Sequence, residues 1–356
     1  MFFDRLKLWS ACAVVATAVA CGGAEPMEEA PAEPMAEAED AAPEATPAGD
    51  GTLLRLDDRF DALVPGGAVI EKVADGYAFT EGPVWVRRGD PDPYLLFSDI
   101  PNNAVRRWSP TEGQSDHIIP VFEDEYPEGR SVGSNGLLID SEGRLILAEH
   151  GNRRLSRREA DGSITVLADS YNGMRLNSPN DGVFHSSGAI YFTDPPYGLL
   201  QQDDDPDKEL DFNGIFRLLP DGTVQHLAEQ SRPNGIALAP DEGTLYVANS
   251  DGADMVWYAY DVAEDGTLGP GRVFVDAHDW DAPGAADGMA IDRNGNLFAT
   301  GPGGVWVIAP DGTHLGSIQP DEPPANAGWG DDGNTLYMTG RTGLYRITLS
   351  TGGTIP

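Results

Sequence analysis

The chain has 356 residues, of which 58 are acidic and 23 basic, giving a net charge of −35 at pH 7. This balance disfavours nucleic acid as a partner, because phosphate binding needs clustered Lys and Arg side chains. The excess of acid is typical of a soluble surface, with attraction of cations as the alternative. The 43 Gly and 28 Pro residues indicate a chain that turns often.

Residues 1–20 resemble an export signal. Arg5 and Lys7 precede a mostly apolar run over residues 8–20, which is too short to span a bilayer stably. The run ends in Ala-Val-Ala-Cys21, which resembles a bacterial lipobox. We therefore expect an exported protein that is lipidated at Cys21 and anchored in the cell envelope, at the periplasm or outer membrane. An ordinary signal peptide is the alternative, and we expect no other contact with a membrane.

Residues 21–53 are predicted to form a disordered tether behind that lipidated cysteine. Residues 24–50 contain nine acidic residues and five Pro, with no basic or aromatic residue. Such a composition buries too little apolar area to offset the entropy lost on ordering. We place the folded domain at residues 54–356. The two cysteines, Cys12 and Cys21, both lie before it, which excludes disulfides, zinc–thiolate sites and a cysteine nucleophile there.

One short strand pattern, three apolar residues followed by a small one, recurs six times in the domain. The spacing between the ends of successive strands fits one four-stranded propeller blade for each repeat. The pattern predicts an all-β, six-bladed β-propeller. The last repeat lacks a fourth strand, whereas residues 68–73 form a strand without a blade, so we expect this N-terminal strand to close the ring. The repeats lie at residues 95–98, 145–148, 189–193, 245–248, 297–300 and 336–339.

Each repeat is preceded by a partner strand that opens on a polar residue close to a Gly. The polar residue stands at a nearly constant separation from the end of the repeated strand in five blades, and farther from it in the first, which holds an extra loop. First strands line the channel of a propeller, so these side chains should face one another. Oxygen donors without Cys or His suit Ca²⁺ or another hard divalent cation, with bound water or turn capping as the alternative. The six residues are Glu81, Asn135, Asn180, Asn234, Asp287 and Asn326.

The loops that follow the repeated strands are expected to form the wall of a polar pocket around the axis. They include His150, the only one of six His residues in such a loop, and Tyr197, which either stacks on a sugar ring or packs on its neighbouring prolines. This lining suits a small hydroxylated substrate. The one GxSxG sequence, at residues 129–133, is followed by a predicted strand and not by the helix of a nucleophile elbow, which argues against a serine nucleophile.

Seven stretches resemble the gluconolactonase family, also called the senescence marker protein 30 or regucalcin-like family. The resemblance covers nearly all of residues 57–350, and LNSPND followed by YFTDPPYG is similar to the bacterial branch. It implies a six-bladed propeller, a catalytic divalent cation and hydrolysis of a sugar lactone. We favour Ca²⁺ as the cation, with Zn²⁺, Mn²⁺ or Mg²⁺ as alternatives. The stretches are EGPVW (81–85), FSDIPNNAVRRW (97–108), AEHGNRRLSR (148–157), RLNSPNDGV (175–183), YFTDPPYG (191–198), SRPNGIALAPDEGTLYVANS (231–250) and DGMAID (287–292).

The resemblance also implies roles for single residues. Asp287 would accept the proton of the attacking water and return it to the leaving oxygen, unless the cation itself activates the water. A substrate-binding Arg of the family is replaced here by Ser178. The implied cation ligands are Glu81, Asn180, Asn234 and Asp287, and the candidate substrate contacts are Asn135, His150, Ser178, Asn180 and Tyr197.

Two other functions remain open from the sequence. The same cation site suits hydrolysis of organophosphates or other non-sugar esters. A propeller is also a common binding scaffold, so a non-catalytic ligand-binding protein is the third hypothesis. In the favoured hypothesis the partner is a small lactone and the protein is a monomer.

Overall fold

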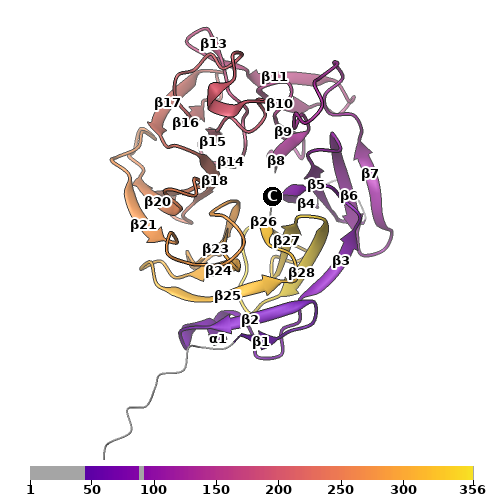
Figure 1. Ribbon diagram of the computed structural model, residues 1–356, viewed down its shortest axis with the longest axis vertical. Coiled ribbons are helices and arrows are strands. Elements are labelled where there is room, and N and C mark those ends of the chain that lie inside the picture. The colour runs from indigo at the N-terminus through magenta and orange to yellow at the C-terminus, as the bar shows by residue number, and fades with distance from the viewer. Residues whose placement is uncertain (1–44, 88–91, 356) are drawn as a thin grey trace, which may run out of the picture. The chain divides into compact units, whose positions relative to one another are not determined.

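Six antiparallel sheets form a closed ring around a central axis in the computed structural model, which describes residues 45–87 and 92–355 (Figure 1). This confirms the predicted all-β, six-bladed propeller. Helix is confined, in the described residues, to α1 (Arg59–Leu63) and the short 3₁₀ turn η1 (Gln202–Asp204). None of the helices in this part of the chain is long and apolar enough to cross a membrane.

We number the blades 1 to 6 along the chain and give their strands from the axis outward. Blade 1 holds β4 (Thr80–Val86), β5 (Tyr94–Asp99), β6 (Ala104–Ser109) and β7 (Gly113–Ile118), and blade 2 holds β8 (Ser134–Ile139), β9 (Leu145–Glu149), β10 (Arg154–Arg158) and β11 (Ile164–Ala168). Blade 3 holds β14 (Gly182–Phe184), β15 (Ile190–Asp194), β16 (Gly214–Leu218) and β17 (Val224–Glu229), and blade 4 holds β18 (Pro233–Leu238), β19 (Thr244–Asn249), β20 (Val256–Asp261) and β21 (Arg272–Asp276). Blade 5 holds β22 (Met289–Ile291), β23 (Leu297–Gly301), β24 (Gly304–Ile308) and β25 (His314–Pro320), and blade 6 holds β26 (Pro324–Gly330), β27 (Thr335–Gly340) and β28 (Gly343–Thr348). A two-stranded hairpin, β12 (Ser170–Tyr171) and β13 (Met174–Arg175), follows blade 2 in the chain.

The ring closes as expected from the unpaired N-terminal strand. Strand β3 (Glu71–Asp75) pairs antiparallel with β28 and becomes the fourth strand of blade 6. The last blade is therefore built from both ends of the domain. Strand β3 thereby covers the edge of β28 that would otherwise be open to another chain.

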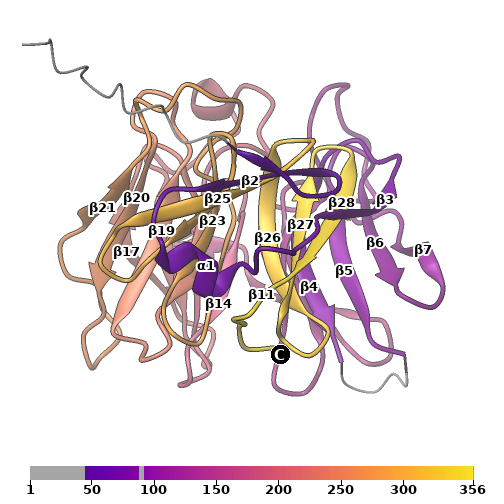
Figure 2. The same cartoon turned by 90° about the horizontal axis from the view of Figure 1, so that it is seen from below.

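The predicted start of the domain at residue 54 is wrong, because ordered strands begin earlier. Strand β2 (Gly51–Arg55) pairs with the outer strand β25 of blade 5 (Figure 2), and β1 (Thr46–Pro47) pairs with β2 (Figure 1). Strand β2 lies just after the acidic, Pro-rich stretch, and its Leu53 and Leu54 are buried against the propeller. The remaining tether, the signal and Cys21 lie outside the described residues.

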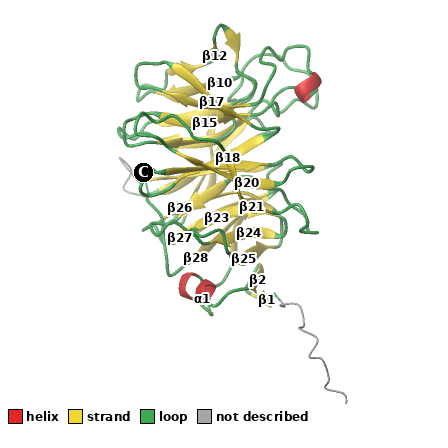
Figure 3. Cartoon of the chain, turned by 90° about the vertical axis from the view of Figure 1, so that its left-hand side faces the viewer, coloured by secondary structure: helices red, strands yellow, loops and turns green. Residues whose placement is uncertain are grey.

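Apolar side chains fill the spaces between neighbouring blades. One cluster joins Tyr191 and Ile215 of blade 3 to Ile236 and Val247 of blade 4, all at most 3% exposed. Another packs Leu53 of the N-terminal segment against blades 5 and 6. The strands end in loops at both sides of the ring (Figure 3), so the two ends of the strands offer two separate loop surfaces.

Candidate active site

A cavity of about 560 Å³ opens at the end of the ring where the first strands begin. It is lined by five of the six predicted axial residues and by two of the predicted loop residues, which are contributed by all blades except the sixth. Seven of the predicted site residues thus share one cavity. They are Glu81, Asn135, Asn180, Asn234 and Asp287, with His150 and Tyr197; the rest of the lining is Ala78, Phe79, Ile100, Pro101, Ser131, Gln202, Ser250 and Ala285.

The small residue that ends each repeated strand explains how the axial backbone is held. In blades 1 and 3 its hydroxyl donates to the backbone carbonyl of the axial residue in the next blade, Ser98 Oγ to Asn135 O at 2.6 Å and Thr193 Oγ1 to Asn234 O at 2.7 Å. Thr300 of blade 5 does the same to Ala325, next to Asn326, at 3.0 Å. In these three blades the repeat therefore holds the axial backbone of the next blade.

Glycine beside the axial residues lets the first strands converge. Gly82 has φ +53°, and a Cβ there would lie 2.2 Å from the carbonyl oxygen of Asn135. A Cβ on Gly235 would lie 2.2 Å from the carbonyl oxygen of Asp287. Any larger residue at either position would push neighbouring blades apart at the axis.

Two carboxylates in the cavity lie in an electrostatically unfavourable setting. Glu81 is 2% exposed, and its Oε2 accepts hydrogen bonds from Asn326 Nδ2 and Gly82 N, both at 2.9 Å. Burial raises the pKa of Glu81 to about 7. Burial, and then the charges of Glu81 and Asp181, raise the pKa of Asp287 well above its ordinary value. No Lys or Arg side chain is among the described residues that line the cavity to offset this charge.

Asp181 is a third axial carboxylate that the sequence analysis missed. Burial raises its pKa to about 6, although its Oδ1 accepts a hydrogen bond from Gly182 N at 2.8 Å. It occupies the position next to Asn180 that is Gly in blades 1, 2, 4 and 5. An acidic residue in place of that repeated Gly was the available signal.

The donors fit a hard divalent cation. The Oδ1 atoms of Asp287 and Asn135 are buried and have no hydrogen-bond partner, which is costly unless a ligand supplies one. Carboxylate and amide oxygens are the ligands that Ca²⁺ prefers. In residues 45–87 and 92–355, no three His, Cys, Asp or Glu side chains by themselves form a group able to hold a metal. The predicted set combines two such carboxylates with the amides of Asn180 and Asn234.

Two predicted residues have other roles in the structure. Ser178 was predicted to contact substrate, but it is fully buried and does not line the cavity; its hydroxyl donates to Pro195 O at 2.6 Å and accepts from Gly198 N at 2.8 Å. Both polar atoms of the Asn326 side chain are also hydrogen-bonded within the protein. Its amide nitrogen donates to Glu81, and its Oδ1 accepts from Ala327 N at 2.8 Å. Asn326 therefore positions Glu81.

The two predicted loop residues are neutral at pH 7. Burial lowers the pKa of His150 to about 4, and its Nε2 lies 3.5 Å from Asn135 Nδ2. Burial raises the pKa of Tyr197 to about 12, and its hydroxyl lies 2.5 Å from Ser250 Oγ. Ser250 Oγ in turn accepts from Asn234 Nδ2 at 3.2 Å. Both residues offer hydrogen bonds to a substrate and no charge.

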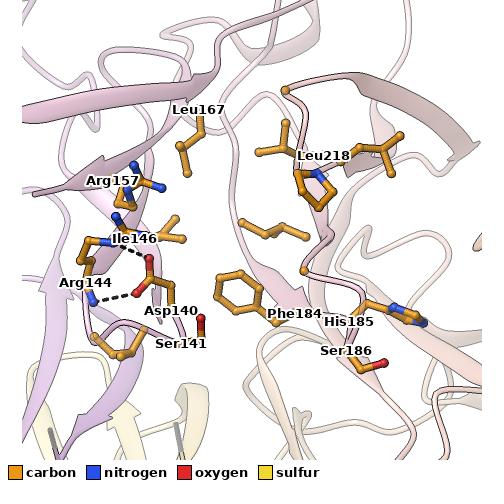
Figure 4. Close-up of a pocket in the computed structure, with 16 residues that line it drawn as sticks. Asp140, Ser141, Arg144, Ile146, Arg157, Leu167, Phe184, His185, Ser186 and Leu218 are labelled. Carbon is orange, nitrogen blue, oxygen red and sulfur yellow. Dashed lines mark hydrogen bonds and ion pairs between the residues drawn. The ribbon is translucent and has the colours of Figure 1, made fainter.

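A second cavity, of about 590 Å³, lies among the turns at the opposite ends of the strands, between blades 2 and 3 (Figure 4). We call it the inter-blade cavity. Its walls are largely apolar, including Ile146, Phe184 and Leu218. Arg144 bridges Asp140 at 2.8 Å and Glu159 at 3.4 Å, and Arg157 also pairs with Glu159. Because these charged side chains are paired with one another, they offer little to bind or activate a substrate.

Comparisons with known proteins agree with the fold. The model of the SMP-30/gluconolactonase/LRE-like region matches residues 79–342. A gluconolactonase of Zymomonas mobilis is 40% identical over 315 residues, covering 85% of this chain and 87% of that protein. A Bacillus subtilis protein named as a putative sugar lactone lactonase is 29% identical, covering 78% of this chain and 93% of that protein.

Solved structures extend the comparison. A gluconolactonase from Xanthomonas campestris superposes with a TM-score of 0.73 and 32% identity, covering 87% of this chain and 99% of that one. A calcium-binding regucalcin from Agrobacterium tumefaciens, at 19% identity and a TM-score of 0.63, shares the fold, covering 80% and 95%. With the family model matching most of the propeller and a relative at 40% identity, this chain belongs to the SMP-30/gluconolactonase/LRE-like family.

Proposed function

We propose that the chain is a cation-dependent hydrolase that opens a sugar lactone. The names of its relatives support lactone hydrolysis. The observation that carries the proposal is the axial cavity, where buried carboxylates and amide oxygens meet without a basic partner. Such an arrangement is unfavourable for folding alone and suits a bound cation next to a polar substrate.

The cation would be held by Glu81, Asn180, Asn234 and Asp287. Ca²⁺ is the first candidate because the donors are hard oxygen atoms, and Zn²⁺, Mn²⁺ and Mg²⁺ are the alternatives. When bound, the cation supplies Lewis-acid polarisation of the lactone carbonyl. Asn326 and Gly82 hold the Oε2 of Glu81 in place, and a bound cation would keep this carboxylate ionised.

Asp287 acts in this proposal as the proton acceptor and donor. A bound cation would keep the Asp287 carboxylate ionised, and a carboxylate oxygen that does not contact the cation could then accept a hydrogen bond from a water molecule. As the water oxygen bonds to the carbonyl carbon, its proton passes to Asp287. The ester bond to the ring oxygen then breaks, and Asp287 returns the proton to that oxygen, which leaves the hydroxy acid. His150, neutral at pH 7, assists only by hydrogen bonding.

The test is turnover by the purified chain after chelation and after return of single cations. The substrates are δ-gluconolactone, an aryl ester and a phosphotriester, each corrected for its uncatalysed hydrolysis. We expect lactone opening that disappears with chelator and returns with Ca²⁺, Zn²⁺, Mn²⁺ or Mg²⁺. Lactone opening that survives exhaustive chelation would remove the cation from the proposal. Turnover of only the aryl ester or the phosphotriester would assign the chain to those substrates instead.

We also propose, from the sequence of residues 1–21, that the protein is exported and lipidated at Cys21. Expression of the full chain in a bacterium fed labelled palmitate should label the protein and place it in the membrane fraction. Cys21→Ser should abolish the label and release the protein. A wild-type chain without label would contradict this proposal.

A further inference from the structure

One connection at the mouth of the axial cavity is much longer than its counterparts. Residues 195–213 join β15 to β16, whereas the equivalent connections are residues 150–153 in blade 2 and residues 250–255 in blade 4. This connection, which we call the blade 3 loop, contributes Tyr197 and Gln202 to the cavity lining. Long loops on a rigid propeller are frequent carriers of specificity.

The blade 3 loop is held from both sides. Arg130, which precedes blade 2, donates from Nε to Gly198 O at 3.0 Å. Arg232, which precedes β18 of blade 4, forms an ion pair with Asp203, and Asn213 Nδ2 donates to Asp203 Oδ1 at 3.0 Å. These contacts fix the segment on either side of Gln202.

Gln202 stands out within this fixed loop. Its φ of +51° lies in the left-handed region, which is unfavourable for a residue with a Cβ. The residue is exposed and lines the cavity, yet no hydrogen bond joins its carboxamide to any residue in the described part of the chain. The loop therefore holds a strained residue whose polar side chain is left for another partner.

Part of the remaining lining is apolar or already hydrogen-bonded. The wall formed by Phe79, Ile100 and Pro101 is apolar and suits the C–H face of a ring. The hydroxyls of Tyr197 and Ser250 are bonded to one another. A sugar lactone carries several hydroxyls, and a carboxamide offers two donors and an acceptor to bind them.

We propose that Gln202 is a specificity-determining residue that hydrogen-bonds a ring hydroxyl of the lactone substrate. This inference rests on the proposed lactone hydrolysis and assigns the selection of hydroxylated over unsubstituted lactones to one residue of the blade 3 loop. Ser178, which replaces the family's Arg, cannot serve because its hydroxyl is buried and bonded. Recognition by a neutral side chain also matches a cavity whose described lining contains no Lys or Arg.

The experiment pairs one substitution with one change of substrate. The full chain with its cation is assayed on δ-gluconolactone and on δ-valerolactone, which has the same ring size and no hydroxyls. Gln202→Ala should lower kcat/KM for δ-gluconolactone about tenfold, as expected for loss of a neutral hydrogen bond, mainly through KM. It should leave δ-valerolactone within about twofold. Gln202→Asn, which keeps a carboxamide and tolerates a positive φ, should retain part of the selectivity.

Gln201→Ala is the matched control, because Gln201 is the exposed neighbour and does not line the cavity. It should change neither substrate. An equal fall for both lactones in Gln202→Ala, or no change for either, would overturn the assignment while leaving lactone hydrolysis intact. A wild-type chain that opens neither lactone would end the proposed function, and the assignment of Gln202 with it.

Discussion

The axial cavity and the inter-blade cavity have nearly equal volumes, about 560 and 590 Å³, but opposite arrangements of polar groups. In the inter-blade cavity each charged side chain meets an opposite charge, as Arg144 does between Asp140 and Glu159. In the axial cavity Glu81 and Asp287 repel one another, and the Oδ1 of Asp287 has no partner. The two cavities therefore differ not in volume but in whether their charged side chains have partners of opposite charge.

The difference indicates what each region contributes. Paired charges over apolar walls stabilise the contact between blades 2 and 3 and offer no free group to a ligand. Buried carboxylates with raised pKa values lower the free energy of unfolding of the cation-free protein at neutral pH. Binding of a cation to the folded state raises that free energy again. Substitutions in the axial cavity should therefore change activity, and those in the inter-blade cavity should change only stability.

The largest expected effect is that of Asp287→Asn. Loss of the proton acceptor should lower kcat by about 10²–10⁴-fold on any lactone that the wild type opens. Because the substitution removes a repelled buried charge, the cation-free variant should be at least as stable as the wild type. Asp140→Asn in the inter-blade cavity is the control and should keep full activity per folded molecule. Undiminished turnover by Asp287→Asn would refute the proposed role.

The pH dependence of stability is the next effect. The pKa of Glu81 is about 7 in the folded chain and 4.5 ordinarily, so the folded state binds this proton more tightly. Its contribution to the free energy of unfolding is full below pH 4.5 and is lost as the pH rises through about 7. At about 1.4 kcal/mol per pKa unit, the loss is at most roughly 3.5 kcal/mol.

Urea unfolding with chelator at pH 5 and pH 8 measures this loss. Glu81→Gln, which has no proton to release, should show a smaller fall between the two values than the wild type. Added cation should reduce the fall in the wild type. Identical pH profiles for the wild type and Glu81→Gln would show that Glu81 does not titrate in this window.

Local periodicity was sufficient to predict most of the fold and of the axial set. The repeated strands, their small final residues and the polar residue before each one are all features of single blades, so five of six axial residues were correctly placed at one cavity. The pairing of β2 with β25 was missed because it joins opposite ends of the domain through backbone atoms. The prediction for Ser178 was wrong because its partners, Pro195 and Gly198, belong to a loop whose path the sequence does not specify.

Asn326→Ala should have a moderate effect that separates positioning from catalysis. Without the hydrogen bond from Asn326 Nδ2, the Oε2 of Glu81 keeps only the one from Gly82 N, and cation affinity should fall about 10- to 100-fold. At saturating cation the kcat should return close to the wild-type value. Titration calorimetry with Ca²⁺ and activity against free Ca²⁺ measure the two quantities. Asn294→Ala, in the turn at the other end of blade 5, is the control. Unchanged affinity in Asn326→Ala would remove Asn326 from the site.

The smallest expected effect is that of Arg144→Met in the inter-blade cavity. Arg144 is 23% exposed, and its pairs with Asp140 and Glu159 are partly screened by water, so their loss should lower the free energy of unfolding by at most about 1 kcal/mol. Met keeps the apolar stem of the side chain against the cavity wall. Arg157→Met, which breaks the other pair with Glu159, should behave alike. Both variants should keep the wild-type kcat/KM and cation affinity. A fall in either quantity would mean that the two cavities are coupled through blades 2 and 3, and that their opposite charge arrangements serve one function.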